Sequence, residues 1–320
     1  MPRGRPLVLS EAEVIPYQDE AAWKQIRRQH IGASEAAAVL GASNYMTPLE
    51  LYYRKRGELP EVTETTPMRV GKALEPIVRE LYQEQTGNRV VCDQWLLVSK
   101  AHPFMAATLD GAVEGTSRLV ELKTAHPRSS GEWGEPGTDE VPVSYLLQVQ
   151  HQMIVAGAEA ADIAVLIGNA DFRVYTVPRH DVLCERIIEA EAEFWEAVKT
   201  GKPPKEQPTD AAVLARIAPK ILDTIDLSDN PEAAADIEVY RSIGAEIKRL
   251  EEARNLAKYR LIRSMAHYES ARVGGLELRR TLVRKKEHTV KATEYIQFSI
   301  KQAKDKTNGD GNDDSGEDAA

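Results

Sequence analysis

Residues Met105 to Thr124 read MAATLDGAVEGTSRLVELKT, and this stretch decides the fold that we expect. Strand side chains alternate between the two faces of a sheet, so Glu121 and Lys123 point one way and Leu122 the other. Asp110 lies where a neighbouring strand can end beside them. Two carboxylates can hold Mg²⁺, and an ammonium can orient the water that attacks a phosphodiester. The stretch therefore indicates a hydrolytic metal site, although two exposed strand ends with solvated charges give the same pattern.

Length and composition describe an ordinary globular protein. The 320 residues suffice for one large domain, or for one domain of about 200 residues with an extension. No run of about twenty apolar residues and no secretory signal occurs, so we expect a cytoplasmic protein without a membrane segment. Cys92 and Cys184 are isolated, and the histidines lack metal-site spacing, which argues against zinc and iron–sulfur centres.

The net charge of −9 does not exclude DNA as a partner, because its distribution is uneven. Five acidic residues follow the last lysine, Lys306. Basic residues instead cluster at Arg27-Arg28, Arg54–Arg56, Arg279-Arg280 and Arg284–Lys286. Binding to phosphate depends on where positive charge lies rather than on its sum.

Hydrophobic periodicity predicts a chain of alternating helices and strands. Helices are expected over 20–30, 34–41, 47–56, 68–86, 143–156 and 181–198, and strands over 90–99, 106–113, 119–124, 163–168 and 172–177. We expect an arm over 1–20, one domain over 21–203, a mainly helical extension over 204–306, and an acidic tail of disordered composition over 307–320. Within the extension, 231–271 is typical of a helical hairpin or an oligomer seam, and 276–290 of an exposed basic strand.

Several polar residues are placed where a site needs them. Ser34 is a good N-cap, and a helix N-terminus near Arg27 is also a candidate phosphate site. The apolar stripe expected on the helix over 68–86 consists of Val70, Leu74, Ile77, Val78 and Leu81. Glu75 lies beside this stripe, where a carboxylate needs a partner such as a metal ion. Gln148 and Tyr145 share a helix face. In the long loop 125–142, a tryptophan, Trp133, either shields the site, stacks on a substrate or pins the loop to the domain.

Five short motifs together resemble the YqaJ-type viral recombinase family, phage nucleases related to lambda exonuclease. They are W-x-x-x-R, I-G-A-S-E, M-x-x-G-x-x-L-E-P, L-D-G followed by E-L-K-T, and Y-x-x-Q-V-Q-H-Q-M, between about Trp23 and Lys199. The resemblance implies an α/β, restriction-endonuclease-like (PD-(D/E)xK) core, with a central mixed sheet flanked by helices. A C-terminal helical extension is added to this core, and residues 21–203 would form the nuclease domain.

The resemblance also implies a metal site. Asp110 and Glu121 would be the metal-binding carboxylates, the carbonyl of Leu122 a further ligand, and Glu75 the group that completes the site. Lys123 would position or activate the attacking water. The cofactor would be Mg²⁺, with two ions bound, and Mn²⁺ is an alternative.

The remaining implied roles concern DNA. Arg27 and Ser34 match positions that grip the 5′-phosphate of the digested strand, and Gln148 would orient the water or the lysine. Tyr145 and Trp133 are further candidates for substrate contact.

The expected function is 5′ to 3′ digestion of linear double-stranded DNA, leaving 3′ single-stranded tails for recombination. The family implies a trimer, a single-strand annealing protein as partner and, for a phage protein, the cytoplasm of the bacterial host. A structure-specific or nicking endonuclease of the same fold is one alternative. A non-catalytic DNA-binding module is another.

Overall fold

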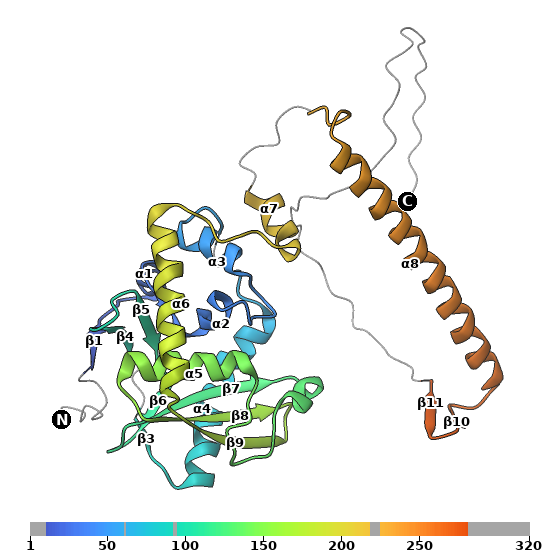
Figure 1. Cartoon of the computed structure of the whole chain (residues 1–320). Coiled ribbons are helices and arrows are strands. Elements are labelled where there is room, and N and C mark those ends of the chain that lie inside the picture. Colours follow the sequence, from blue (N-terminus) through green and yellow to red (C-terminus); the bar gives the residue numbers. More distant parts are fainter. Residues whose placement is uncertain (1–10, 61, 92–94, 218–224, 281–320) are drawn as a thin grey trace, which may run out of the picture. The chain divides into compact units, whose positions relative to one another are not determined.

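The computed structural model describes residues 11–60, 62–91, 95–217 and 225–280 (Figure 1). Cys92, the end of the predicted basic strand (281–290) with Arg284–Lys286, and the acidic tail 307–320 lie outside the described residues. The chain divides into two units, at residue 219. The boundary lies later in the chain than the expected one at 203. The reason is that Val213 is buried against Leu49 and Leu59, so residues after 203 still belong to the first unit.

A five-stranded mixed sheet forms the centre of the first unit. Its order is β3-β6-β7-β8-β9, with β7 and β8 parallel and the other pairs antiparallel. The strands are β3 (Val90–Val91), β6 (Gly111–Val113), β7 (Arg118–Ala125), β8 (Ala160–Ile167) and β9 (Asp171–Pro178). Helices cover both faces, as the mixed α/β prediction requires (Figure 1).

The two faces of the sheet bury different helices because strand residues alternate. On one face, Val78 and Tyr82 of α4 (Thr66–Thr86) pack on Val120 and Leu122 of β7. On the other face lies α5 (Val143–Ala156), whose residues share a core with Leu119, Ile163 and Val165. Glu121 and Lys123 therefore face α5.

A second, four-stranded sheet has the order β1-β4-β5-β2. Its strands are β1 (Ala12–Ile15), β4 (Leu96–Ser99), β5 (Met105–Thr108) and β2 (Ile31–Gly32). The prediction of one strand over 106–113 is wrong, because β5 ends at Thr108 and the chain enters β6 of the central sheet at Gly111. Asp110 thus lies at the junction of the two sheets.

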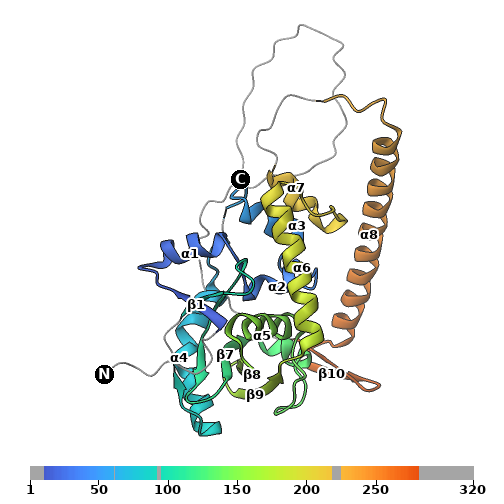
Figure 2. The ribbon, with the colours of Figure 1, turned by 60° about the vertical axis from the view of Figure 1, so that its left-hand side comes forward.

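The N-terminal helices carry the other predicted residues. They are α1 (Glu20–Arg28), the 3₁₀ turn η2 (Ala33–Glu35), α2 (Ala36–Val39) and α3 (Pro48–Lys55). Ser34 is not the N-cap that we expected, because it lies inside η2, which begins after Gly32. The long α6 (Asp181–Thr200) runs from α5 to α3, where Phe194 and Val198 pack on Leu51 and Tyr52 (Figure 2).

The apolar face of α4 differs from the predicted stripe. Val70 and Ile77 are exposed, whereas Val78 and Tyr82 are fully buried. A Cβ at Gly71 would lie 3.3 Å from the Thr124 hydroxyl of β7. Positions 71, 75, 78 and 82 recur at helical spacing, so the inward face of α4 includes Glu75.

Shorter elements complete the first unit. The loop 125–142 contains the 3₁₀ turn η3 (Pro127–Glu132), and the segment after α6 contains η4 (Pro208–Asp210) and α7 (Ala211–Ile217).

The second unit contains α8 (Pro231–Ser264) and a hairpin of β10 (Ser270–Val273) and β11 (Leu276–Arg279). The hairpin turns through Gly274, whose φ of +58° suits glycine. Because α8 is one continuous helix, the interpretation of 231–271 as a helical hairpin is wrong. In the described part of the chain, no helix combines the length and apolar character needed to cross a membrane.

Candidate active site

One cavity of about 570 Å³ brings together eight of the ten residues predicted to form the site. Its walls include Arg27, Ser34, Glu75, Asp110, Glu121, Leu122, Lys123 and Gln148. These residues come from α1, η2, α4, the junction of the sheets, β7 and α5.

Strand register places Asp110 beside Glu121. Gly111 pairs with Val120 in the antiparallel ladder of β6 and β7. In an antiparallel pair the two chains run in opposite directions, so Asp110, which precedes Gly111, lies opposite Glu121, which follows Val120. The carboxylate of Asp110 is fixed there by a hydrogen bond of 2.9 Å from the backbone N–H of Leu122. The backbone of β7 therefore positions the first carboxylate, while its side chains supply the second.

Glu121 is buried and accepts three hydrogen bonds from side chains. Lys123 Nζ and Gln148 Nε2 donate to its Oε1 atom, the latter at 2.5 Å, and Gln152 Nε2 donates to Oε2 at 2.6 Å. Sequence reasoning selected Gln148 and missed Gln152. Their spacing of four residues, which places both on one face of α5, is the signal that would have found it.

The carboxylates repel one another in this site. Burial and the charge of Glu121 raise the pKa of Asp110 to about 8, against the opposing effect of Lys123. Burial also raises the pKa of Glu75, with a further contribution from Glu121. Burial alone would lower the pKa of Lys123, but the charges of Glu121 and Asp110 raise it above its ordinary value. Lys123 is therefore a cation.

The donor chemistry of this site fits a hard divalent cation. Only oxygen ligands are offered, and a cation between Asp110 and Glu121 would relieve their repulsion. A carboxylate has about four lone-pair sites, and Glu121 uses three for hydrogen bonds, so Oε2 can take one more partner. Within the described ranges, no group of three or more His, Cys, Asp or Glu side chains is arranged so that it could hold a metal ion, so the fit rests on the Asp110–Glu121 pair.

Arg27 and Ser34 meet at another wall of the cavity. Arg27 Nη2 donates to Ser34 Oγ at 3.0 Å, and the guanidinium lies 4.8 Å from the centre of the Trp23 ring. Trp23 is fixed in turn by a hydrogen bond of 3.0 Å from Nε1 to the Thr108 hydroxyl of β5. The arginine is therefore held at the cavity by groups from α1, η2 and β5.

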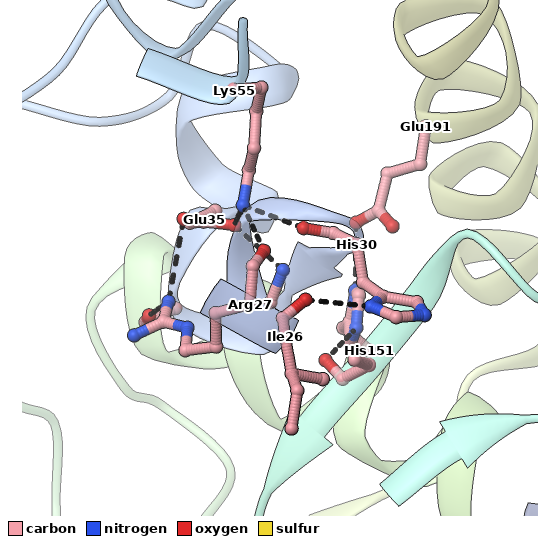
Figure 3. Close-up of polar contacts among 10 residues, drawn as sticks. Ile26, Arg27, His30, Glu35, Lys55, His151 and Glu191 are labelled. Atoms are coloured by element: carbon pink, nitrogen blue, oxygen red, sulfur yellow. Dashed lines mark hydrogen bonds and ion pairs between the residues drawn. The ribbon is translucent and has the colours of Figure 1, made fainter. Parts of the chain in front are cut away.

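Two residues behind Arg27 carry charge that sequence reasoning did not assign, Glu35 and Lys55 (Figure 3). Their side chains form an ion pair of 2.6 Å, and Glu35 also lies 3.4 Å from Arg27 Nη2. Glu35 belongs to the quoted I-G-A-S-E motif, three residues after Gly32, a spacing that is a known helix-start signal. Lys55 belongs to the basic cluster Arg54–Arg56, but nothing local in the sequence points to its contact with Glu35.

A buried pair holds α5 over the site. His151 and Glu191 of α6 are 2.8 Å apart through Nδ1 and Oε1, and His151 Nε2 lies 3.0 Å from the carbonyl oxygen of Ala106 in β5. Both side chains are fully buried, and burial raises the pKa of Glu191. Since His151 lies between Gln148 and Gln152 on the same helix, the contacts of His151 fix the position of both glutamines relative to the sheet.

Tyr145 and Trp133 do not line the cavity. Tyr145 contacts the site through Lys123, whose Nζ lies 5.2 Å from the centre of its ring. Trp133 is only 5% exposed, and its ring packs between those of Tyr145 and Tyr175, with centroids 5.4 and 5.3 Å apart. Trp133 therefore pins the loop 125–142 to the core, which is one of the three roles expected for it, and its buried ring is not placed to stack on a substrate.

The fold and this arrangement of carboxylates and lysine define a restriction-endonuclease-like class: a mixed sheet with Asp at one strand junction and Glu-x-Lys on the next strand. Residues 22–159 match the model of the YqaJ-like viral recombinase domain.

Parts of this chain are similar to other proteins. YqaJ of Bacillus subtilis (strain 168) is 33% identical over 208 residues, which are 63% of this chain and 64% of that protein. The chain thus spans slightly less than two thirds of this relative. A solved structure of LHK-Exo, an alkaline exonuclease from Laribacter hongkongensis, is 23% identical, with a TM-score of 0.47 over 56% of this chain and 93% of that one. A phage-related exonuclease from Haemophilus somnus 129PT is 11% identical, with a TM-score of 0.41 over 56% and 99%.

Proposed function

We propose that this protein is a metal-dependent exonuclease that digests linear double-stranded DNA from 5′-phosphorylated ends. One observation carries the proposal: Arg27 with Ser34 and the Asp110–Glu121–Lys123 group line the same cavity. A cation and a hydroxyl suited to a terminal phosphate thus share one space with the groups suited to phosphodiester hydrolysis. A volume of about 570 Å³ is within the usual range of ligand sites.

The side chains of the site have distinct tasks in this proposal. Asp110 and Glu121 would hold the divalent ions, with Glu75 and the Leu122 carbonyl at their side. When bound, the metal supplies Lewis-acid polarisation of the phosphodiester and of the attacking water. Lys123, as a cation, would donate a hydrogen bond to a phosphate oxygen on which negative charge develops. Gln148 and Gln152 fix the orientation of Glu121, and Arg27 with Ser34 fixes the end of the strand.

The test compares three DNA substrates in Mg²⁺ and in EDTA. They are a linear duplex with 5′-phosphates, the same duplex with 5′-hydroxyls, and a closed circle. We expect metal-dependent loss of the linear forms alone, faster with the 5′-phosphate. A label on the terminal 5′-nucleotide should be released as a mononucleotide before a label at the 3′ end.

Each other outcome contradicts a part of the proposal. Cutting of the circle would identify an endonuclease, and early release of the 3′ label would reverse the polarity. Binding of all substrates without cleavage in Mg²⁺ or Mn²⁺ would identify a DNA-binding module. Asp110→Asn, prepared in parallel, should abolish cleavage, and its retention of activity would refute the assignment of the metal site.

We infer from the family resemblance a role in recombination, which the chemistry of the product supports. Digestion from 5′ ends leaves 3′ single strands, and these are the substrates of a single-strand annealing protein. The same resemblance supports a trimer and action in the cytoplasm of a bacterial host. The mass of the particle that the full chain forms in solution tests the trimer. Co-purification with an annealing protein encoded beside it tests the partner.

A further inference from the structure

Lys55 is held by three acceptors behind the cavity. Its Nζ donates to the carbonyl oxygens of Arg27 at 2.8 Å and His30 at 2.6 Å, and it lies 2.6 Å from Oε2 of Glu35 (Figure 3). An ammonium has three donors, so these contacts use all of them. The Lys55 side chain is 3% exposed. Lys55 thus connects the end of α3 to the C-terminal end of α1, where Arg27 lies.

Glu35 links this lysine to the guanidinium. Its Oε2 atom accepts a hydrogen bond of 2.7 Å from the backbone N–H of Gly32 as well as the contact with Lys55. Its Oε1 atom lies 3.4 Å from Arg27 Nη2. Burial alone would raise the pKa of Glu35, but the charges of Lys55 and Arg27 lower it below its ordinary value. The carboxylate is therefore ionised and shared between two cations.

The guanidinium is also enclosed sterically. A Cβ at Gly32 would lie 2.8 Å from Arg27 Nη2, so the backbone of Gly32 is pressed against it. The Trp23 ring and the Ser34 hydroxyl contact Arg27 as well. Arg27 is therefore held in one orientation before any ligand arrives, and such preorganisation reduces the entropy lost on binding.

The charges of Arg27, Glu35 and Lys55 set the local charge around the guanidinium. Two cations and one carboxylate leave a net charge of +1 beside the cavity, which favours a terminal phosphate of −1.5 to −2. Without Lys55 the net charge would be zero, and Glu35 would hold Arg27 as its single counter-ion. With neither Lys55 nor Glu35 charged, the net charge would again be +1.

We propose that Glu35 and Lys55 are positioning residues, which orient Arg27 and keep its charge available for the 5′-phosphate of a DNA end. This inference rests on the proposed function, since it needs Arg27 to contact that phosphate. Lys55 binds the carboxylate that would otherwise neutralise the arginine, and Glu35 fixes the direction of the guanidinium. Neither residue touches the substrate itself.

The test is a binding measurement on the full chain in EDTA, so that no DNA is cleaved. Fluorescence anisotropy gives the affinities for one labelled duplex with a 5′-phosphate and for the same duplex with a 5′-hydroxyl. We expect Lys55→Met to reduce the preference for the phosphate about tenfold, or about 1.4 kcal/mol. We expect Glu35→Gln combined with Lys55→Met to recover most of that loss, which a purely structural role of Lys55 would not produce.

Two further variants make the test decisive. Gly32→Ala changes no charge but displaces the guanidinium, and it should also reduce the preference, even if Lys55→Met does not fold. Lys24→Met removes an exposed cation of the same helix, which pairs with Glu20, and should leave the preference unchanged. Thermal unfolding of each variant confirms that folded proteins are compared.

The outcomes separate this inference from the proposed function. If Arg27→Ala retains the phosphate preference, the proposed contact with the DNA end is wrong. If Arg27→Ala loses it while Lys55→Met and Gly32→Ala keep it, only the inference fails. Equal loss in Lys55→Met and in the double variant would also overturn the inference, because the charge of Glu35 would then have no part in it.

Discussion

Lys123 Nζ donates to the carboxylate of Glu121, two residues earlier on the same strand, and this pairing holds the lysine as a cation in a largely buried site. Because the two residues share one face of β7, a single strand supplies both a metal-binding oxygen and a positive charge. A protonated lysine cannot accept a proton from water. In the proposed hydrolysis, the contribution of Lys123 would therefore be electrostatic.

Replacement of Lys123 tests this electrostatic role. We expect Lys123→Met to reduce kcat about 10²–10³-fold, the usual effect of removing one donor from a developing charge. Lys123→Arg should keep part of the activity, and its rate should depend on pH between 7 and 9 as the wild-type rate does, because arginine does not deprotonate there. A rate that no longer changes with pH in Lys123→Arg would show instead that Lys123 acts as the base.

Asp110 makes the stability of the metal-free protein depend on pH. Its pKa is about 8 in the folded state and about 4 in an unfolded chain. Between these values the folded state binds more protons than the unfolded state, so the free energy of unfolding falls as the pH rises. In EDTA at pH 8, Asp110→Asn should therefore be more stable than the wild type by about 2 kcal/mol, which corresponds to about 4–8 °C in Tm.

Metal addition and a matched aspartate provide the controls for that measurement. Mg²⁺ should raise the Tm of the wild type at pH 8 more than that of Asp110→Asn. Asp162 is also buried, but it accepts hydrogen bonds from Tyr82 and Thr176, so Asp162→Asn should be less stable than the wild type. If Asp110→Asn were destabilised like Asp162→Asn, repulsion between the carboxylates would not be the dominant effect.

The strand-borne part of the site could be predicted from the sequence because strand geometry is local. The alternation of β7 places Glu121 and Lys123 together whatever packs above them. The exact position of Asp110 could not be derived in this way. Residues 106–113 read as one strand, and nothing in the pattern shows that the chain changes sheets after Thr108.

The other features that the sequence did not predict are contacts between elements that lie far apart in the chain. Lys55 meets the end of α1 only through the tertiary fold, and no periodicity links residues so far apart in the sequence. The predicted stripe of α4 included Val70 and Ile77, which are exposed, because apolar residues occur on more than one side of that helix. The side that faces the sheet carries Gly71, close to Thr124, and the buried Val78 and Tyr82.

The two glutamines of α5 should differ in their effect on stability and activity. Gln152 is buried, so Gln152→Ala leaves Glu121 Oε2 without its donor and should cost about 1–3 kcal/mol of stability as well as activity. Gln148 lines the cavity, so Gln148→Ala should mainly lower kcat. Urea unfolding and steady-state kinetics measure the two effects separately.

A third glutamine on the same helix is the control for this comparison. Gln150 donates to the Pro178 carbonyl and accepts from the His180 N–H, away from the cavity. Gln150→Ala should therefore lower stability without changing kcat of the folded fraction. A loss of kcat equal to that of Gln148→Ala would mean that any change in α5 disturbs the site, and would remove the specific role of Gln148.

Trp133 should affect stability rather than DNA binding. Its ring lies between Tyr145 and Tyr175, and Tyr175 also donates to the carbonyl of Gly134 at 2.8 Å. Trp133→Ala removes a buried aromatic and should cost about 3–5 kcal/mol. Trp133→Phe keeps much of the packing, and we expect its KM for linear duplex DNA to equal that of the wild type. A marked rise in KM for Trp133→Phe, with Tm little changed, would show that the tryptophan leaves the core and stacks on the substrate.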